Sequence, residues 1–352
     1  ESAIRRVIDR CQTAADNHDG IEQQDVNVLK LLYLVRYIED IKANIDNISI
    51  NLPRLALITE KELPKATFEE KMRVFSAKWD EIASLTKDIL LDRYRKVCER
   101  VSEDFPINKV HHLWKEDFGD ISSVFRHGTL SLGFIGLSEA IEVLSGKRFY
   151  EDAECYMEAI GFVKHMREYC DFLRGHYKLN FSLLATSGEL ISGRFIDMDA
   201  QEFDTEADIF EKGFYTNSFH VPVYYPCSAF HKLSTEAPYH ELTNGGHISY
   251  VEMDGDPMQN LDAFEKIVRF MHDSGIGYGS INHPVDRDPV CGYNGIIGDS
   301  CPHCGRTEND GNRRFERIRR ITGYLVGTLD RFNNAKRAEE RDRVKHGLNK
   351  DA

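Results

Sequence analysis

Three cysteines close together near the C-terminus constrain this chain more than any other feature of its sequence. Cys291, Cys301 and Cys304 lie within 14 positions, in the stretch CGYNGIIGDSCPHCG with the spacing C-x9-C-x2-C, and the first and last are each followed by a glycine. Thiolates bind Zn tetrahedrally, and a C-x2-C-G turn directs two sulfur atoms towards one ion. Core thiols are a weaker explanation because the stretch is polar and rich in glycine. The spacing therefore predicts a structural zinc site.

The fourth ligand of such a site is not fixed by the spacing. Asp288 stands three residues before Cys291, where the first cysteine of a second C-x2-C arm would stand, while His283 and His303 are nearby nitrogen donors. A carboxylate can ligate Zn, so we rank Asp288 first and His283 second. The alternative is that Asp288 is a surface turn residue and that the chain supplies no fourth ligand.

The composition of the 352-residue chain excludes several classes of protein. With 41% hydrophobic and 29% charged residues and a formal net charge of −13, it can bury at least one full core and is not mainly disordered. No apolar run approaches the roughly 18 residues that a membrane helix needs, and the N-terminal ESAIRRVIDR has no signal-peptide core. We therefore expect a cytoplasmic protein without a membrane partner, whose cysteines are thiols or metal ligands.

Basic residues are concentrated between Arg313 and Lys345, where 11 Lys and Arg stand against 5 Asp and Glu. A solvated basic arm would bind nucleic acid. Here the basic residues are interleaved with apolar ones such as Ile318, Leu325 and Phe332, a pattern typical of a packed segment whose arginines pair with acidic groups or substrate phosphates. We therefore expect no nucleic-acid partner.

The hydrophobic pattern predicts helices and short strands in alternation. Thr67 and Glu70 form the signature of a capping box at the start of a helix. The apolar residues expected on the core face of this helix are Phe68, Met72, Phe75, Trp79, Ile82 and Ile89. Residues 48–58 are expected to form a strand, and Pro53 near its middle either places it at the edge of a sheet or ends regular pairing there. This alternation favours an α/β, barrel-like arrangement. Further helices are expected over residues 1–47 and 150–177, and further strands over residues 179–186, 219–225, 247–253 and 277–281.

A motif after the cysteines points to a known family. Residues 320–324, RITGY, resemble the R-[IV]-x-G-Y signature of glycyl radical enzymes. Further segments resemble the anaerobic, class III ribonucleoside-triphosphate reductases over about residues 48–347. These segments are INLPRLAL (50–57), FRHGTLSLGFIGLSEA (125–140), NFSLLATSGELISGRF (180–195), YTNSFHVPVYY (215–225) and APYHELTNGGHISYVE (237–252).

The resemblance implies a fold and a chemistry. It implies part of a ten-stranded α/β barrel over residues 48–285, then a zinc-binding and glycyl radical domain over residues 286–352, with a helical segment 1–47 that does not match the family. The implied activity is reduction of ribonucleoside triphosphates to deoxyribonucleotides. An activating enzyme with S-adenosylmethionine and an iron–sulfur cluster would install the radical, nucleotide effectors would bind, and the protein would be a homodimer.

Individual residues match positions of the family. Gly323 matches the radical glycine, where the unpaired electron at Cα is shared between amide nitrogen and carbonyl, and where a side chain would crowd the planar centre. Asn51 matches the asparagine near the substrate and, in some members, near the formate reductant. The turn with Thr186 and Ser187 matches a loop that receives substrate phosphate, although capping hydroxyls would explain it equally well. Asn217 and Ser218 are expected to line the same pocket.

One departure from the family concerns the thiyl-forming cysteine, which precedes the NLPR segment in its members. Cys11 is the single cysteine before Asn51 in this sequence, in a segment that reads as helix. Cys227 is the other substitute, although a packed thiol explains it better. The earlier half of the barrel and the ATP-binding cone are not found in these 352 residues. Two alternatives stay open: a non-enzymatic zinc-binding interaction module, and another glycyl radical enzyme, an acyltransferase or lyase.

Overall fold

The computed structural model divides the chain into two compact units. One consists of Glu1–Asp46, Leu90–Leu130 and Tyr177–Asn180, and the other of Asn47–Ile89, Ser131–His176 and Phe181–Ala352. The predicted site residues that the structure describes all belong to the second unit. The structure describes residues 44–110, 121–204, 208–253, 257–283, 285–311, 313–321, 324–326 and 332–347.

The first unit contributes short elements and the ends of longer ones. Within it, Arg93 pairs with Asp46 at 2.9 Å, and the rings of Phe105 and Phe125 lie with their centroids 5.5 Å apart. The helix expected over residues 1–47 lies outside the described residues up to residue 43, and residues 44–47 belong to a strand. The short elements are η1 (Ser102–Asp104), α5 (Pro106–Val110) and α6 (Ser122–Phe125).

Three strands form a sheet in the order β1 (Asn44–Asn51), β2 (Thr129–Ile135) and β3 (Asn180–Ala185). The central strand β2 is buried along its whole length, as expected for a strand covered on both faces. An isolated parallel bridge between Leu184 and Gly246 continues the pairing beyond β3. The strand predicted over residues 179–186 is thus confirmed.

The strand expected over residues 48–58 is wrong beyond Asn51, where helix α3 (Leu52–Glu62) begins. The Asn51 side chain accepts a hydrogen bond from the amide of Arg54, so it caps this helix. Pro53 lies in the first turn, where a missing N–H costs nothing because that group has no partner within the helix. The proline therefore starts a helix instead of interrupting a strand.

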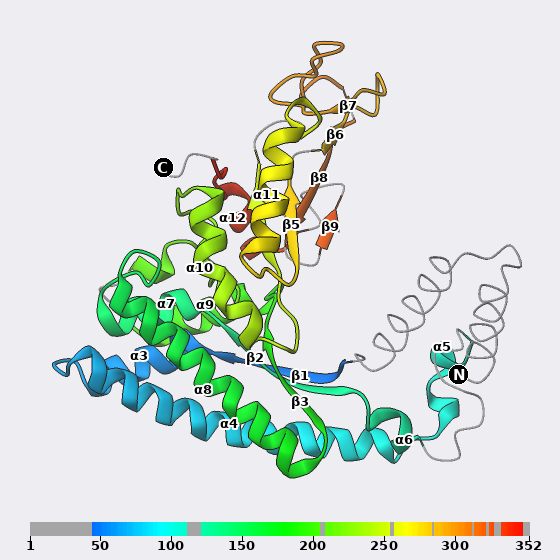
Figure 1. Cartoon of the computed structure of the whole chain (residues 1–352). Helices are drawn as coiled ribbons and strands as arrows, with labels where there is room; N and C mark the ends of the chain where they lie inside the picture. Colours follow the sequence, from blue (N-terminus) through cyan, green and yellow to red (C-terminus); the bar gives the residue numbers. More distant parts are fainter. Residues whose placement is uncertain are drawn as a thin grey trace, which may run out of the picture. The chain divides into compact units, whose positions relative to one another are not determined.

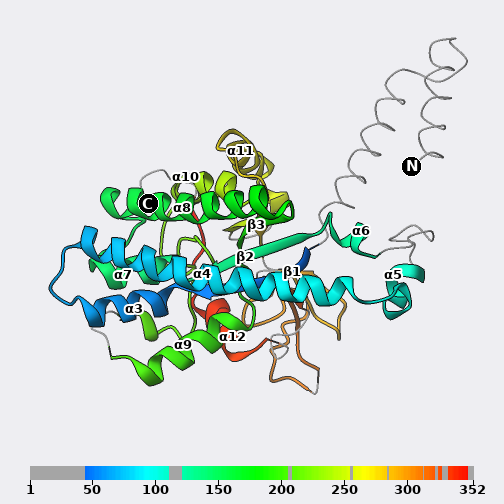
Figure 2. The same ribbon diagram turned by 90° about the horizontal axis from the view of Figure 1, so that it is seen from below.

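Helices α4 (Phe68–Cys98) and α8 (Ala153–Tyr177) lie side by side (Figures 1 and 2). The capping box is confirmed, because the amide of Thr67 donates to Glu70 at 2.9 Å and the amide of Glu70 donates to the Thr67 hydroxyl at 3.3 Å. Phe75 packs against Phe162 with ring centroids 4.6 Å apart. The predicted core face is confirmed for Met72, Phe75 and Trp79 and wrong for Ile82 and Ile89, which are 38% and 37% exposed.

Strands β4 (Ser249–Glu252) and β5 (Gly279–Asn282) pair in parallel, with Val251 opposite Ile281. Helices α10 (Ala229–Leu242) and α11 (Leu261–Asp273) pack a hydrophobic cluster against them. Both strands were predicted, but the one expected over residues 219–225 is wrong. That segment runs through turns, in which Ser218 has a positive φ of 41° and the amide of Tyr225 donates to the Pro222 carbonyl. Two prolines, at 222 and 226, remove ladder donors there.

Four short strands between residues 285 and 326 form an antiparallel sheet in the order β7-β6-β8-β9. Helix α12 (Asn334–Asp342) follows it, and the basic segment packs as predicted, with Phe332, Lys336 and Glu339 buried. The strands are β6 (Val285–Arg287), β7 (Asn294–Gly295), β8 (Glu316–Ile321) and β9 (Tyr324–Val326), and the other elements are α7 (Leu137–Ser145), α9 (Ile191–Glu202), η2 (Asp208–Phe210) and η3 (Pro257–Gln259).

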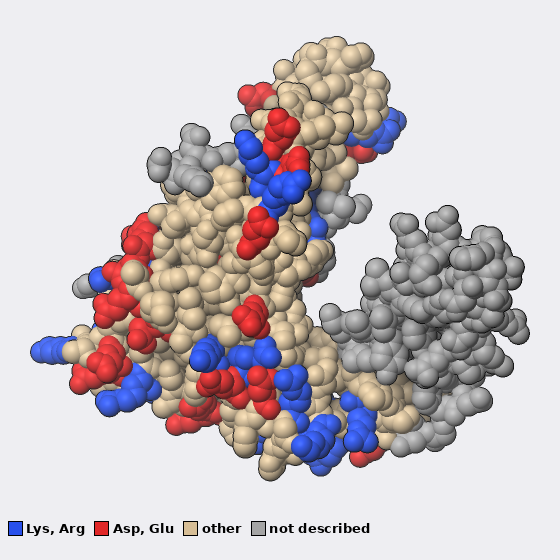
Figure 3. Space-filling model, in the orientation of Figure 1, with Lys and Arg blue, Asp and Glu red and all other residues tan. Residues whose placement is uncertain are grey.

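The fold class is therefore α/β, as predicted. In the described part of the chain the strands form three separate sheets and do not close a barrel. None of the helices there is both long enough and apolar enough to cross a membrane. On the face shown in Figure 3, Lys and Arg side chains lie interspersed with Asp and Glu.

Candidate metal and substrate sites

The structure brings Asp288 and the three cysteines together. One ligand atom from each of Asp288, Cys291, Cys301 and Cys304 lies within 4.8 Å of all the others. The sulfur atoms of Cys291 and Cys301 are 3.6 Å apart, and the sulfur of Cys304 lies 3.3 Å from a carboxylate oxygen of Asp288. Zn–S bonds of about 2.3 Å in a tetrahedron separate two sulfurs by about 3.8 Å. The cluster therefore fits zinc, and neither His283 nor His303 belongs to it.

Two glycines after cysteines shape the loops of the cluster. Gly292 and Gly305 have positive φ angles of 79° and 73°, a conformation that glycine adopts without a steric penalty. Their amides donate to the carbonyls of Asp288 and Cys301, at 2.9 and 2.8 Å, so each turn closes around a ligand. Beneath the cluster, Cys301 packs with Ile297 and Phe315. The C-G pairs read from the sequence thus have a conformational cause.

Sequence analysis missed Arg306, which holds the carboxylate of the cluster. Its guanidinium donates to both oxygens of Asp288, at 2.8 Å from Nη2 and at 3.2 and 3.3 Å from Nε, and it lies over the ring of Phe315 at 4.5 Å. Asp288 is fully buried. The hydrogen bonds from Arg306 hold the pKa of Asp288 well below its usual range, so the group is a carboxylate, the form that binds a metal.

Asn51 is part of a second group of polar residues, centred on the buried Asp199. The amide nitrogen of Asn51 donates to Asp199 at 2.7 Å, and Arg54 and the Tyr215 hydroxyl donate to the same carboxylate at 2.8 and 2.9 Å. Burial, together with the nearby Asp199 charge, raises the pKa of Tyr215, which therefore stays a phenol and donates. Asp199 lies on α9, 148 positions after Asn51, and nothing local in the sequence signals this pairing.

The turn after β3 contacts the segment that holds Asn217. The amide of Gly188 donates to the Asn217 side-chain oxygen at 2.8 Å, and Asn217 bridges to Ile135 at the end of β2. Ser218 is buried, and no described atom forms a hydrogen bond with its hydroxyl. Thr186 is buried and Ser187 is exposed. The turn with Thr186 and Ser187 thus lies beside the segment that holds Asn217 and Ser218, and a substrate pocket formed by the four residues stays a prediction.

A close contact links this turn to the strand that ends at Asn51. The hydroxyls of Ser49 and Thr186 are 2.7 Å apart across the middle strand of the sheet. They meet over Gly133, where an added Cβ would lie 2.2 Å from the Thr186 hydroxyl and 2.7 Å from that of Ser49. Real Cβ atoms do not approach other atoms so closely, so the contact requires glycine at position 133. Gly323, the remaining predicted site residue, lies outside the described residues.

Glu139, on α7, holds the segment before Asn217 and is a titratable group that sequence analysis missed. One of its oxygens accepts from the Thr216 amide at 2.8 Å and from the Thr216 hydroxyl at 2.6 Å. Burial raises the pKa of Glu139 from 4.5 to about 7, against these hydrogen bonds, which lower it. The folded chain therefore keeps a proton on Glu139 at pH values where the unfolded chain has lost it.

We expect Glu139 to make the protein less stable as the pH rises from about 5 to about 8. Because the folded pKa lies above the unfolded one, stability that is present below the unfolded pKa is lost as the pH rises through the folded pKa. The loss amounts to at most about 3 kcal/mol. Urea unfolding at several pH values should show a weaker pH dependence for Glu139→Gln, which keeps the acceptor oxygen, than for the wild type. Equal pH dependences for the two proteins would contradict the assignment.

Known proteins resemble almost the whole chain in sequence. A sequence model of the family described as anaerobic ribonucleoside-triphosphate reductase matches residues 8–346. The chain is 33% identical over 321 residues to the anaerobic ribonucleoside-triphosphate reductase of Escherichia coli (strain K12), covering 88% of this chain and 43% of the relative. It is 32% identical over 326 residues to that of Enterobacteria phage T4, covering 87% of this chain and 49% of the relative.

Solved structures share the fold. An anaerobic ribonucleotide reductase superposes with a TM-score of 0.69 at 18% identity, covering 87% of this chain and 45% of that one. The anaerobic ribonucleotide reductase from Thermotoga maritima in complex with dATP and CTP gives a TM-score of 0.63 at 17% identity, covering 86% of this chain and 45% of that one.

The sequence matches cover most of this chain but only part of each relative. The chain spans less than half the length of these curated relatives. The family match begins at residue 8, and so includes most of the segment 1–47 that we expected to lie outside the family.

Proposed function

Because the chain belongs to the anaerobic ribonucleoside-triphosphate reductase family, we propose that it supplies the radical-bearing and part of the substrate-binding machinery of an enzyme that reduces ribonucleoside triphosphates to deoxyribonucleotides. One observation carries the proposal. Strand β6, which leads into the metal cluster, pairs with β8, which leads into the RITGY segment, with Val285 opposite Ile318. One small sheet therefore connects the loops of the cluster with the strand that leads into the glycine segment, residues 320–324.

We infer the domain organisation on the same basis. Residues 48–285 would form a portion of the family's ten-stranded barrel, and residues 286–352 the zinc-binding and glycyl radical domain. The bridge between Leu184 and Gly246 supports the first part, because it continues the first sheet towards the segment that leads into β4. The position of β6 and β8 in one sheet with the metal loops supports the second.

Zinc at Asp288, Cys291, Cys301 and Cys304 would act as a structural cross-link. Bound there, the metal would supply four fixed bonds between these loops and would take no part in the reaction with substrate. Its consequence is mechanical. The loops hold the end of β6, and β6 holds β8 through three residue pairs.

The turn after β3 would receive a substrate phosphate. Two of its amides are already used, since Gly188 donates to Asn217 and Glu189 donates to the Ser187 carbonyl at 2.9 Å. The exposed Ser187 is therefore the group of this turn that is best placed to meet an anion, and the buried Thr186 is held by Ser49. The hydroxyl of Ser218, which no described atom pairs with, is a further donor on the neighbouring segment.

Asn51 would present its amide to the substrate in a single orientation. The amide nitrogen of Asn51 donates to Asp199, which also pairs with Arg54, while the amide oxygen accepts from the Arg54 backbone N–H. One N–H and one oxygen lone pair remain for a ligand. The N–H can donate to a ribose hydroxyl or to the carboxylate of formate, and the lone pair can accept from a ribose hydroxyl. Both formate and a dithiol therefore stay open as reductants.

The proposed enzyme needs partners that the family supplies. A glycyl radical at Gly323 would be installed by an activating enzyme with S-adenosylmethionine and an iron–sulfur cluster. Nucleotide effectors are inferred from the Thermotoga maritima relative, which was solved with dATP and CTP. We further propose a homodimer. The family match favours this function over an acyltransferase or lyase.

Turnover is the experiment that tests this function. Thiyl chemistry requires a cysteine within about 3 to 3.5 Å of the hydrogen that it removes, and Cys11 is the single cysteine before Asn51. We therefore expect the isolated chain, activated anaerobically, to form no deoxynucleotide from a ribonucleoside triphosphate with an effector and either formate or a dithiol. Addition of a chain that supplies the earlier half of the barrel should restore product formation.

Two outcomes would count against this mechanism. Product formed by the isolated chain would show that the thiyl cysteine lies within it, and loss of that product in Cys11→Ser or Cys227→Ser would identify the residue. Burial raises the pKa of Cys227 to about 11, which keeps it a thiol. Absence of both radical and product in the complemented enzyme would overturn the proposed function itself.

A further inference from the structure

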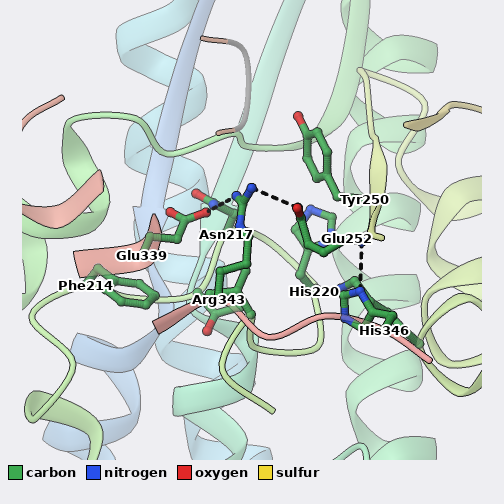
Figure 4. A pocket seen from close by; sticks show the side chains of 11 residues that line it. Phe214, Asn217, His220, Tyr250, Glu252, Glu339, Arg343 and His346 are labelled. Carbon is green, nitrogen blue, oxygen red and sulfur yellow. Dashed lines mark hydrogen bonds and ion pairs between the residues drawn. The ribbon is translucent and has the colours of Figure 1, made fainter. Parts of the chain in front are cut away.

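A small cavity beside α12 is lined by several charged side chains (Figure 4). Lys232 and Glu339 are 3% and 2% exposed, and the side chains of Arg343 and Glu252 are 8% and 6% exposed. Burying a charge is costly unless it is paired. Figure 4 shows the Arg343 guanidinium between the carboxylates of Glu339 and Glu252, with His346 on the far side of Glu252.

Arg343, directly after α12, contacts this helix and two strands that are distant from it in sequence. Its Nη1 lies 2.8 Å from Glu252 on β4 and donates to the carbonyl of Arg320 on β8, also at 2.8 Å. Its Nη2 lies 3.5 Å from Glu339 on α12. Glu252 in turn accepts from the side chain of Asn282 on β5 at 2.8 Å. One guanidinium thus joins the end of β8 and helix α12 to the parallel strand pair.

The chain after Arg343 is held to β4 by its backbone as well. The amide of His346 donates to the Glu252 carbonyl at 2.8 Å, and the amide of Glu252 donates to the His346 ring at 2.9 Å. The amide of Val344 donates to Val223 at 2.9 Å. At the other end of this segment, Asn333 donates from its side chain to the Glu189 carbonyl at 2.9 Å. These hydrogen bonds fix the backbone next to Arg343, so its side chain contacts β8 from a fixed position.

We propose that Arg343 is a positioning residue that holds the end of β8, which precedes Gly323, and helix α12, which follows it further along the chain, at a fixed separation from β4. Its contact with Arg320 is three residues before Gly323. The inference that this geometry serves a radical rests on the proposed function, whereas the positioning itself does not. Arginine suits this role because its planar fork reaches the acceptors from two nitrogens in fixed directions, whereas the single nitrogen of a lysine would have to lie within hydrogen-bond distance of all three acceptors.

Hydrogen–deuterium exchange of the full chain tests the positioning without any radical. In Arg343→Lys we expect the amides of β8 and β9 to exchange at least about tenfold faster, with no change in α4 and α8. Arg337→Lys, an exposed change on the same helix, is the matched control and should leave all these rates unchanged. Uniform acceleration across α4, α8 and β8 would show a general loss of stability and overturn the proposal, as would unchanged exchange in β8.

A second variant covers the case in which Arg343→Lys fails to fold. Glu252→Gln keeps an acceptor for Asn282 and leaves the contact between Arg343 and Glu339 in place, so it should loosen β8 by a smaller factor with the same pattern. Unchanged exchange in β8 of this variant would also overturn the proposal.

Electron paramagnetic resonance of the activated chain then separates the two claims. With the proposed function correct, the radical signal of Arg343→Lys should decay several-fold faster than that of the wild type. Equal decay in variant and wild type, alongside loosened β8 amides, would overturn the link between positioning and the radical. If even the wild type gives no signal, the proposed function fails and the exchange result alone decides the positioning.

Discussion

Replacement of Gly323 by alanine is expected to abolish the glycyl radical completely. A radical at Cα is stabilised when the centre is planar and the electron is shared between the amide nitrogen and the carbonyl, and a Cβ crowds that geometry. Anaerobic incubation of the wild-type chain with the activating enzyme should give a glycyl radical signal in electron paramagnetic resonance. Subsequent exposure to air should cut the backbone at residue 323, and Gly323→Ala should show neither the signal nor the cleavage.

A matched glycine in the same domain controls this experiment. At Gly298 an added Cβ meets no other atom within 4 Å, so Gly298→Ala should fold normally and give the wild-type signal and cleavage. A normal radical yield in Gly323→Ala would place the radical on another residue. Loss of the signal in both variants would mean that the activating enzyme no longer recognises the domain, and mass spectrometry of the cleaved wild-type chain would then locate the radical.

Replacement of Cys301 by serine should remove the metal and unfold the loops around it. Cys301 is 1% exposed and packs with Ile297 and Phe315, so its loss removes a ligand and disturbs the small core beneath the cluster. Binding energy on the order of 10 kcal/mol is available from a structural zinc site, and much of it stabilises the fold. The purified wild type should contain about one Zn per chain. Cys301→Ser should contain almost none and should be cut by protease after Asp288.

Two comparisons make the metal prediction specific. Cys98→Ser, at the end of α4 and outside the cluster, should keep the metal. Asp288→Ala should lose most of it, and His283→Ala should not, since the cluster contains Asp288 and not His283. The reverse result would make His283 the fourth ligand. A well-folded wild type with far less than one equivalent of Zn would show that the cysteines serve another purpose.

The parts of the structure that were predictable from sequence have causes within a few residues. The metal loops follow from the cysteine spacing and from two glycines placed where the backbone needs a positive φ. The start of α4 follows from the reciprocal hydrogen bonds of Thr67 and Glu70. Asn51 and Pro53 carried a comparable local signal, because an asparagine cap with proline in the next turn is typical of a helix start. The prediction of a strand over residues 48–58 gave more weight to the apolar residues of this stretch than to Asn51 and Pro53.

The residues that sequence analysis missed have causes elsewhere in the chain. Asp199 pairs with Asn51 over 148 positions, and Glu139 holds Thr216 over 77. An acidic residue on a helix is usually solvated, so neither carried a signal of burial. The strand expected over residues 219–225 was favoured by its aromatic and β-branched residues, whose preference for strands depends on tertiary context. In the structure this segment forms turns, and Asn217, just before it, contacts the turn after β3.

The contact between Ser49 and Thr186 depends on Gly133, although Gly133 forms no part of that hydrogen bond. Because Gly133 has no Cβ, the hydroxyls of Ser49 and Thr186 can meet over strand β2. Their contact connects the strand that ends at Asn51 with the turn after β3. A residue of this region can therefore be sensitive to substitution without lying next to the substrate. A side chain as small as a methyl group at position 133 would separate two segments that each hold candidate ligand-binding residues, although Gly133 itself needs to touch no ligand. Surveys of variants that score only direct contacts would overlook this position.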